Sequence, residues 1–196
     1  MAYVGWIVLT YLVAAFPFGL LVAQVCCGID PRQAGSRNTG ATNVARLCGT
    51  RYGIITLVLD LAKGAVPVLV ARAMSDSWVF VSLVLLAALA GHMFSVYLHG
   101  KGGKGVATAI GVFLAAAPLS ALLGAACCVA VIAATGYVSA GSLVLAVALP
   151  VFCFVLGPVA LTPAAVVAAA AIIWKHRENI ARLRAGQEKP WRKRGN

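Results

Sequence analysis

The sequence has little charge, and very little of that charge is negative. Only five of its 196 residues are Asp or Glu, and charged residues of both signs make up 11%, against about 25% in an average soluble domain. No pair of carboxylates stands out for acid–base work, and the clustered acids, Cys or His that a metal site needs are missing. The sequence also lacks a Gly-x-Ser-x-Gly nucleophile motif and a His-Glu-x-x-His zinc motif. We therefore expect neither a metal nor a cofactor.

Long apolar runs take the place of that charge. Hydrophobic residues make up 62% of the chain, and a helix needs about 20 predominantly apolar residues to cross a bilayer. These runs predict an all-α integral membrane protein in which residues 1–196 form a single polytopic domain. They cover about residues 3–25, 52–73, 78–98, 106–134, 138–156 and 163 onwards.

The basic residues bear on topology. A net charge of +11 would suggest nucleic acid in a soluble protein, but in a membrane protein it follows from the positive-inside rule, and we expect no nucleic-acid partner. Lys and Arg gather in residues 28–51, in residues 98–108 and in the tail from Lys175. These segments share one face if residues 106–134 form two helices broken near Pro118, one of them short or strongly tilted. The prediction is then seven transmembrane helices, with the amino terminus outside and the carboxy terminus and the active site at the cytoplasmic face.

The loop LHGKGGKGVAT, residues 98–108, places glycines and lysines at the mouth of a membrane helix. It is not a dinucleotide-binding fingerprint, because that motif needs a preceding strand. Glycines let backbone amides converge on an anion, lysines add charge, and the next helix, expected from about Gly105, points its amino-terminal end at the same place. The alternative, a solvated basic turn, leaves the glycines unexplained. The candidate anion-binding residues are Gly100, Lys101, Gly102, Gly103, Lys104 and Gly105.

The first polar loop, AGSRNTGATNVAR, repeats this chemistry with different residues. Hydroxyl and amide side chains supply hydrogen bonds, and Arg46 can form a planar fork to a phosphate. An ordinary polar loop with helix-capping residues is an equally open interpretation. Two such loops on one face suggest one or two substrates that carry two phosphate groups. The candidates here are Ser36, Gly40, Thr42, Asn43 and Arg46.

A third cluster lies in WKHRENIARLRAGQE, where His176 and Asn179 stand three residues apart and share a helix face. Ser139 and Ser142 begin a helix on the same predicted side, where they either cap the helix or contact an anion. In the second apolar run, Asp60 and Lys63 form either a structural ion pair or a direct contact to substrate.

These three clusters resemble a known family. The stretches GIDPRQAGSRNTGATNVAR, GHMFSVYLHGKGGKGVAT and HRENIARLRAGQE are similar to the three cytoplasmic motifs of the bacterial acyl-phosphate:glycerol-3-phosphate acyltransferases, the PlsY family. The similarity covers nearly the whole chain, in the same order and with similar spacing. The chain departs from the family at Ala15, Ser95 and His99, and Arg37 stands where the family often has Gly.

The resemblance implies a seven-helix protein of the bacterial inner membrane that transfers a fatty acyl group from acyl phosphate to the 1-hydroxyl of glycerol 3-phosphate. The products are lysophosphatidate and inorganic phosphate, and this is the first step of phospholipid biosynthesis. The implied partners are these two substrates and membrane lipids. By position, His176, Asn179, Lys104 and Ser36 match residues implicated in catalysis or binding, as does Arg46, and Glu188 matches a residue with a structural role.

As a hypothesis, the Gly100–Gly105 loop with Lys104 holds the departing phosphate, and Ser36, Arg46 and Asn179 position glycerol 3-phosphate. The base that takes the hydroxyl proton is either His176 or a phosphate oxygen of the donor. Because acyl phosphate is already activated, positioning and charge stabilisation suffice. The sequence leaves open the acyl-chain preference, the oligomeric state and which loop binds which phosphate.

Another class of function fits part of the pattern. An organic-phosphate transporter also uses broken helices and cationic sites, but its substrate binds near the middle of the membrane. The predicted anion loops instead cluster at one face, which favours an enzyme at the membrane surface.

Overall fold

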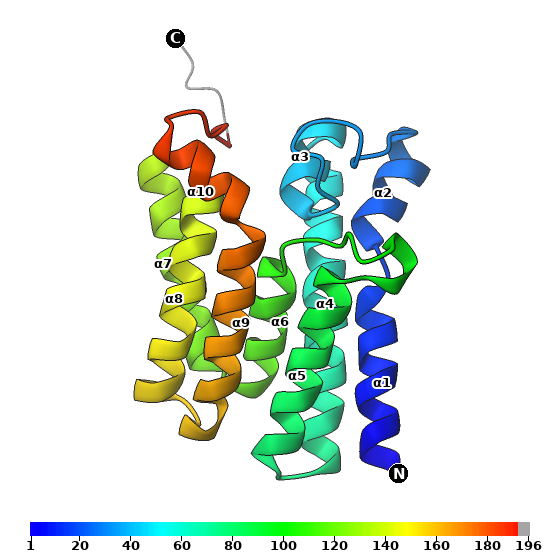
Figure 1. Ribbon diagram of the computed structural model, residues 1–196, viewed down its shortest axis with the longest axis vertical. Helices are drawn as coiled ribbons and strands as arrows, with labels where there is room; N and C mark the ends of the chain where they lie inside the picture. The colour runs from blue at the N-terminus through cyan, green and yellow to red at the C-terminus, as the bar shows by residue number, and fades with distance from the viewer. Residues whose placement is uncertain (192–196) are drawn as a thin grey trace. The chain divides into compact units, whose positions relative to one another are not determined.

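The computed structural model describes residues 1–191, and these residues form helices and connecting loops without any β-strand (Figure 1). Five helical segments among them are long and apolar enough to cross a membrane, and the bent pair Val159–Lys175 and Arg177–Arg184 would be a sixth. The all-α integral membrane fold predicted from the sequence is therefore confirmed. The five segments are Ala2–Cys27, Thr50–Met74, Trp78–Leu98, Pro118–Thr135 and Val138–Leu156.

The chain folds as two compact units, and the first consists of residues 1–116. In this unit α4 (Thr50–Met74) packs against each of the other α-helices. Its core contains buried side chains such as Val68, Leu85 and Phe113. The other elements are α1 (Ala2–Ala15), α2 (Phe18–Cys27), α3 (Ala41–Cys48), α5 (Trp78–Met93), the short 3₁₀ turn η1 (Val96–Leu98) and α6 (Val106–Ala116).

The second unit begins at residue 117. Here α8 (Val138–Leu156) lies between its neighbours and packs against α7, α9 and α10. The last two helices meet at His176, where the chain bends by 58°. The other elements are α7 (Pro118–Thr135), the 3₁₀ turn η2 (Val159–Leu161), α9 (Thr162–Lys175) and α10 (Arg177–Arg184).

The first apolar run is broken in its middle. The sequence predicts one span over residues 3–25, whereas the structure ends α1 at Ala15 and starts α2 at Phe18. Pro17 causes the break, because it has no backbone N–H and disfavours helical geometry at the residue before it. Phe16 accordingly has φ −62° and ψ 125°, which is extended backbone.

Side chains from other parts of the first unit bond the carbonyl groups that this break exposes. Lys63 donates from Nζ to the carbonyl of Phe16 at 3.0 Å, and Ser95 donates from Oγ to the carbonyl of Ala15 at 2.6 Å. In the other direction, the hydroxyl of Tyr11 on α1 donates to the carbonyl of Phe94, at the end of α5, at 2.8 Å. Since apolar surroundings supply no water for these groups, the bonds are what makes the two helix ends tolerable.

The predicted break near Pro118 is confirmed, because α6 ends at Ala116 and α7 begins at Pro118. Proline is well suited to this first helical position, where its missing N–H costs nothing. With 11 residues α6 is about 16 Å long, roughly half of the hydrocarbon thickness of a bilayer. The expectation that one of the two helices is short is therefore also confirmed, while the total of seven crossings stays a prediction.

Arg37 offers a test of the loop geometry. It is exposed and has a left-handed φ of 55°, a conformation that strains any residue with a Cβ. We expect Arg37→Gly to raise the free energy of unfolding by about 1 kcal/mol, which is about 2–4 °C in melting temperature for a chain of this size. Arg37→Ala is the matched control, because it removes the same side chain but keeps the strain. Thermal unfolding in detergent measures both, and equal behaviour of the two variants would contradict the explanation.

Candidate functional site

The glycine loop folds back onto the end of α5. The amides of Gly100, Gly102 and Gly103 donate to the carbonyls of Ser95, Met93 and His92 at 2.9, 3.2 and 3.0 Å. These amides were expected to converge on an anion, and the structure instead uses them inside the protein. Other donor groups at this place are the first-turn amides of α6, which have no acceptor within their own helix, and the ammonium groups of Lys101 and Lys104.

The glycines have steric reasons to be glycine. A Cβ on Gly102 would overlap the carbonyl oxygen of His92, and a Cβ on Gly103 would overlap the His92 ring. Gly105 has a φ of +84°, and a Cβ there would overlap the side chain of Met93. Gly102, Gly103 and Gly105 therefore serve the close packing of the loop on the end of α5, a cause that the sequence alone did not reveal.

Asn43 organises the first polar loop from within. Its side chain is buried, and Nδ2 donates to the carbonyls of Pro31, Ala34 and Asn38 at 2.9, 3.1 and 2.9 Å. Its Oδ1 accepts from the amide of Ser36 at 2.8 Å. Because these bonds occupy both ends of the side-chain amide, the geometry favours a role in shaping the loop over the substrate contact expected from the sequence.

The other candidates of this loop lie around the beginning of α3. Gly40 precedes the helix, Thr42 lies in its first turn and is partly buried, and Arg46 lies in its last turn and is exposed. Ser36 is exposed, and its position depends on the bond to Asn43. Hydroxyl, guanidinium and amide donors therefore come from one short helix and the loop before it, a set of groups that suits a phosphate.

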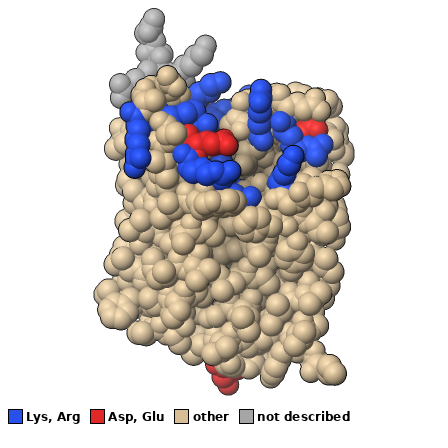
Figure 2. Space-filling model, in the orientation of Figure 1, with Lys and Arg blue, Asp and Glu red and all other residues tan. Residues whose placement is uncertain are grey.

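The acidic residue of this loop is neutralised within the loop. Arg32 bonds both oxygens of Asp30, with its Nη2 2.7 Å from Oδ2. A hydrogen bond from Arg32 accordingly holds the pKa of Asp30 below its usual value. Arg32, Arg37, Arg46 and Lys101 of the first unit are exposed, and Figure 2 draws the Lys and Arg side chains of the face shown in blue. Phosphate groups are attracted to such a surface.

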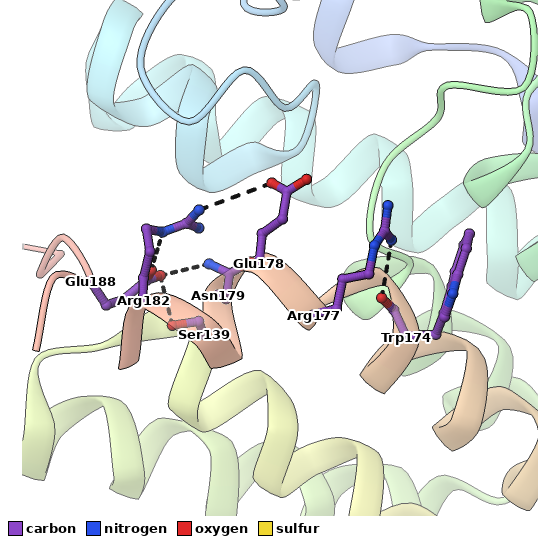
Figure 3. A network of polar contacts seen from close by, with 7 residues as sticks. All are labelled: Ser139, Trp174, Arg177, Glu178, Asn179, Arg182 and Glu188. Atoms are coloured by element: carbon purple, nitrogen blue, oxygen red, sulfur yellow. Dashed lines mark hydrogen bonds and ion pairs between the residues drawn. The ribbon is translucent and has the colours of Figure 1, made fainter. Parts of the chain in front are cut away.

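In the second unit, Glu188 is the centre of a polar network (Figure 3). Its Oε1 accepts from Ser139 Oγ at 2.8 Å and from Asn179 Nδ2 at 2.6 Å, and its Oε2 accepts from Arg182 Nε at 2.7 Å. The network joins the first turn of α8 to α10 and fixes the side chain of Asn179. The structural role that the resemblance implies for Glu188 agrees with this geometry.

These bonds shift the titration of Glu188. Burial raises its pKa, but hydrogen bonds from Arg182, Asn179 and Ser139 lower it by more, so that the pKa lies below the usual value. The side chain is only 8% exposed, so solvent screens these interactions weakly. Glu188 is therefore ionised at neutral pH and stabilises the fold in that form.

His176 lies at the bend between α9 and α10 and is 3% exposed. Its Nδ1 is 2.8 Å from the carbonyl oxygen of Ile172. A carbonyl only accepts, so this contact makes Nδ1 the protonated nitrogen of the neutral ring and leaves the basic lone pair on Nε2. In this tautomer His176 has the form of a general base.

The remaining candidates of the second unit bond within the protein. Ser139 donates to Glu188, and Ser142 donates to the carbonyl of Val138 at 2.8 Å. Both hydroxyls were expected to contact an anion or cap a helix, and the geometry favours a structural role for each. Nearby, the Arg177 guanidinium stacks 4.6 Å from the centre of the Trp174 ring, and Arg177 Nη1 donates to the Trp174 carbonyl (Figure 3).

The structure thus groups the predicted residues by unit. The first unit holds the candidates from Ser36 to Gly105, and the second holds Ser139, Ser142, His176 and Asn179. Sequence reasoning missed the packing of His92 beneath the glycine loop. A lone His in an apolar run carries no signal for such a role.

Comparisons with known proteins agree with these motifs. A protein-family model described as glycerol-3-phosphate acyltransferase matches residues 4–186. A glycerol-3-phosphate acyltransferase of Solidesulfovibrio magneticus is 69% identical over 98% of this chain and 97% of its own, and one of Maridesulfovibrio salexigens is 52% identical over 99% and 100%.

Solved structures are similar as well. A crystal structure of PlsY (YgiH), an integral membrane glycerol 3-phosphate acyltransferase, in its glycerol 3-phosphate form has a TM-score of 0.93 and 39% identity, covering 97% of this chain and 96% of that one. The lysophosphatidic acid form has a TM-score of 0.91 and 38% identity, covering 97% and 95%.

The Glu188 network predicts a specific pH dependence. The pKa of Glu188 in the folded state lies below 4.5, so its contribution is fully present above that pH and is lost as the pH falls through the folded-state pKa. Glu188→Gln should lower the free energy of unfolding by roughly 2 kcal/mol at pH 7, and its difference from wild type should close below pH 4.5.

Glu178→Gln is the matched control for this measurement. Glu178 is 76% exposed and 4.0 Å from Arg182, so its loss should change stability little at any pH. Unfolding midpoints of wild type and both variants are compared from pH 7 to pH 3. A Glu188→Gln deficit that persists unchanged at the lowest pH would contradict the explanation.

Proposed function

The chain belongs to the glycerol-3-phosphate acyltransferase family, and from this premise we propose that it transfers a fatty acyl group from acyl phosphate to the 1-hydroxyl of glycerol 3-phosphate. The products are lysophosphatidate and inorganic phosphate. The observation that carries the proposal is the likeness, over nearly the whole chain, to a protein whose structures are described in glycerol 3-phosphate and lysophosphatidic acid forms. The transporter alternative is not favoured by these relatives.

In this proposal, residues of the first unit bind the phosphate groups. The side chains of Lys101 and Lys104 and the first turn of α6 hold one phosphate at the glycine loop. Ser36, Arg46 and the first turn of α3 hold the other. Asn43 acts behind them as a positioning residue, because its bonds set the shape of the loop that carries Ser36.

Proton transfer falls to the second unit. The tautomer set by Ile172 lets His176 Nε2 accept the proton of the attacking hydroxyl, while Asn179, fixed by Glu188, orients the acceptor. A phosphate oxygen of the donor is the other candidate for the base. The hydroxyl oxygen then bonds to the acyl carbon, and the bond from that carbon to the bridging oxygen breaks, so that phosphate leaves with its oxygen.

Membrane placement follows from the substrates. An acyl phosphate has a tail that belongs in lipid and a phosphate that belongs in water, and loops at the ends of apolar helices receive both. The excess of Lys and Arg in these loops supports a cytoplasmic position for them by the positive-inside rule. We therefore propose seven crossings in the bacterial inner membrane as a single catalytic domain, with the amino terminus outside and the carboxy terminus and the active site on the cytoplasmic side.

The activity itself is the first test. Purified protein in detergent is given palmitoyl phosphate and glycerol 3-phosphate, and lysophosphatidate and phosphate are measured, with acyl-CoA as a parallel donor. We expect product from acyl phosphate only, and a fall of roughly 100-fold or more in kcat/KM for Lys104→Ala. Arg72→Ala is the matched control, since Arg72 stacks on Trp78 at the end of α4 and has no proposed role. If the wild-type protein forms no product from acyl phosphate, the proposal is wrong.

The role of His176 is tested separately. In His176→Asn the amide nitrogen can still reach the Ile172 carbonyl, so the bend is kept while the base is lost. We expect kcat to fall by roughly 100-fold or more, with the KM for glycerol 3-phosphate within about threefold of wild type. A large rise in that KM at unchanged kcat would show that His176 binds substrate instead.

A further inference from the structure

A buried cluster of ionisable side chains lies directly beneath the glycine loop. Lys63 Nζ is 2.8 Å from Asp60 Oδ1, and His92 Nδ1 is 3.7 Å from the same oxygen. The three side chains are 3%, 3% and 7% exposed. Charges buried this deeply in a membrane helix bundle are costly and need a specific reason to be kept.

His92 connects the cluster to the glycine loop. Its carbonyl accepts from the amide of Gly103, and its ring lies so close to Gly103 that a Cβ there would overlap Nε2. The carbonyl of the next residue, Met93, accepts from Gly102. The middle of the loop therefore packs directly on the His92 ring at Nε2, while Nδ1 of the same ring faces Asp60.

Lys63 connects the cluster to the break between α1 and α2. In addition to Asp60 it bonds the carbonyl of Phe16, which the α1–α2 break exposes. Residues from the break, the first polar loop, the charged cluster and the glycine loop line one small cavity, with Gly19, Thr39, Asp60, Lys63, His92 and Gly103 among them. Both polar loops of this unit thus meet the cluster at a single place.

A purely structural ion pair explains less of this arrangement. Asp60 and Lys63 are three residues apart on α4 and could neutralise each other without contacting anything else. Instead, Asp60 also faces His92, on which the glycine loop packs. Lys63 also bonds the α1–α2 break, which lines the same cavity as Gly102 and Gly103. Sub-ångström placement of a binding loop matters for catalysis, and this cluster sits where that placement is set.

We propose that Asp60, Lys63 and His92 form a positioning unit that holds the glycine loop in the geometry in which it binds its phosphate substrate. None of the three touches the substrate; they act through the backbone of Gly102 and Gly103. The inference rests on the proposed acyltransferase activity, because it concerns the affinity for one of that reaction's two phosphate substrates.

The test separates the two substrates by their KM values in the palmitoyl phosphate assay. Gly102→Ala first identifies the substrate of the loop, since its Cβ would push the loop off His92 and raise one KM. His92→Ala removes the ring on which the loop packs. It should raise the same KM roughly 10-fold to 100-fold and leave the KM of the other substrate within about twofold. His92→Gln reaches as far as the ring and should recover most of the affinity.

Two further variants keep the test decisive. Val84→Ala, at a fully buried position on the same helix, should lower the melting temperature with both KM values unchanged. Asp60→Asn combined with Lys63→Met removes the pair without leaving a single buried charge, and should raise the same KM as His92→Ala. This double variant answers the question if His92→Ala does not fold.

The outcomes are distinct. A rise confined to the KM of the loop's substrate, with recovery in His92→Gln, supports the positioning unit. A folded His92→Ala or double variant with wild-type KM values overturns it, as does an equal rise in both. Absence of acyltransferase activity in the wild-type protein would instead refute the proposed function.

Discussion

The fold of the first unit depends on hydrogen-bond donors for the backbone carbonyls that are exposed where helices are interrupted inside an apolar bundle. Helices α1 and α5 both end within long apolar runs, and their terminal carbonyls would be left without partners in lipid. Lys63, Ser95 and Tyr11 donate to these carbonyls, and Asp60 neutralises the Lys63 that makes this possible. A charged pair that looks expensive by itself thus supplies a partner for one of the carbonyls that the interruptions expose.

Interrupted helices in turn make the chemistry possible. Because α5 ends early, the glycine loop can pack against its last residues and deliver the chain to the start of α6. In the second unit the bend after α9 does the same for His176, and Glu188 holds Asn179 close by. In both units the candidate site residues come from helix ends and loops, while exposed apolar side chains line the helix sides.

The sequence predicted much of this and missed what depends on distant contacts. The apolar runs, the break at Pro118 and the start of α6 follow from local composition, and the structure has all three. The α1–α2 break was not predicted, although Pro17 marks it, because apolar residues continue on both sides. The inward-facing Asn43 and the glycine amides bonded to α5 were missed, since neither can be inferred without knowing which carbonyls the fold brings near. The number of crossings stays a prediction.

An isotope label tests whether the acyl group passes from acyl phosphate to glycerol 3-phosphate by attack at the acyl carbon. Palmitoyl phosphate carrying ¹⁸O at the bridging oxygen is turned over with glycerol 3-phosphate, and the products are followed by ³¹P NMR and mass spectrometry. Attack at the acyl carbon predicts one labelled phosphate for each lysophosphatidate formed, with no label in the new ester. Phosphate released without lysophosphatidate, or label retained in the acyl product, would contradict the account.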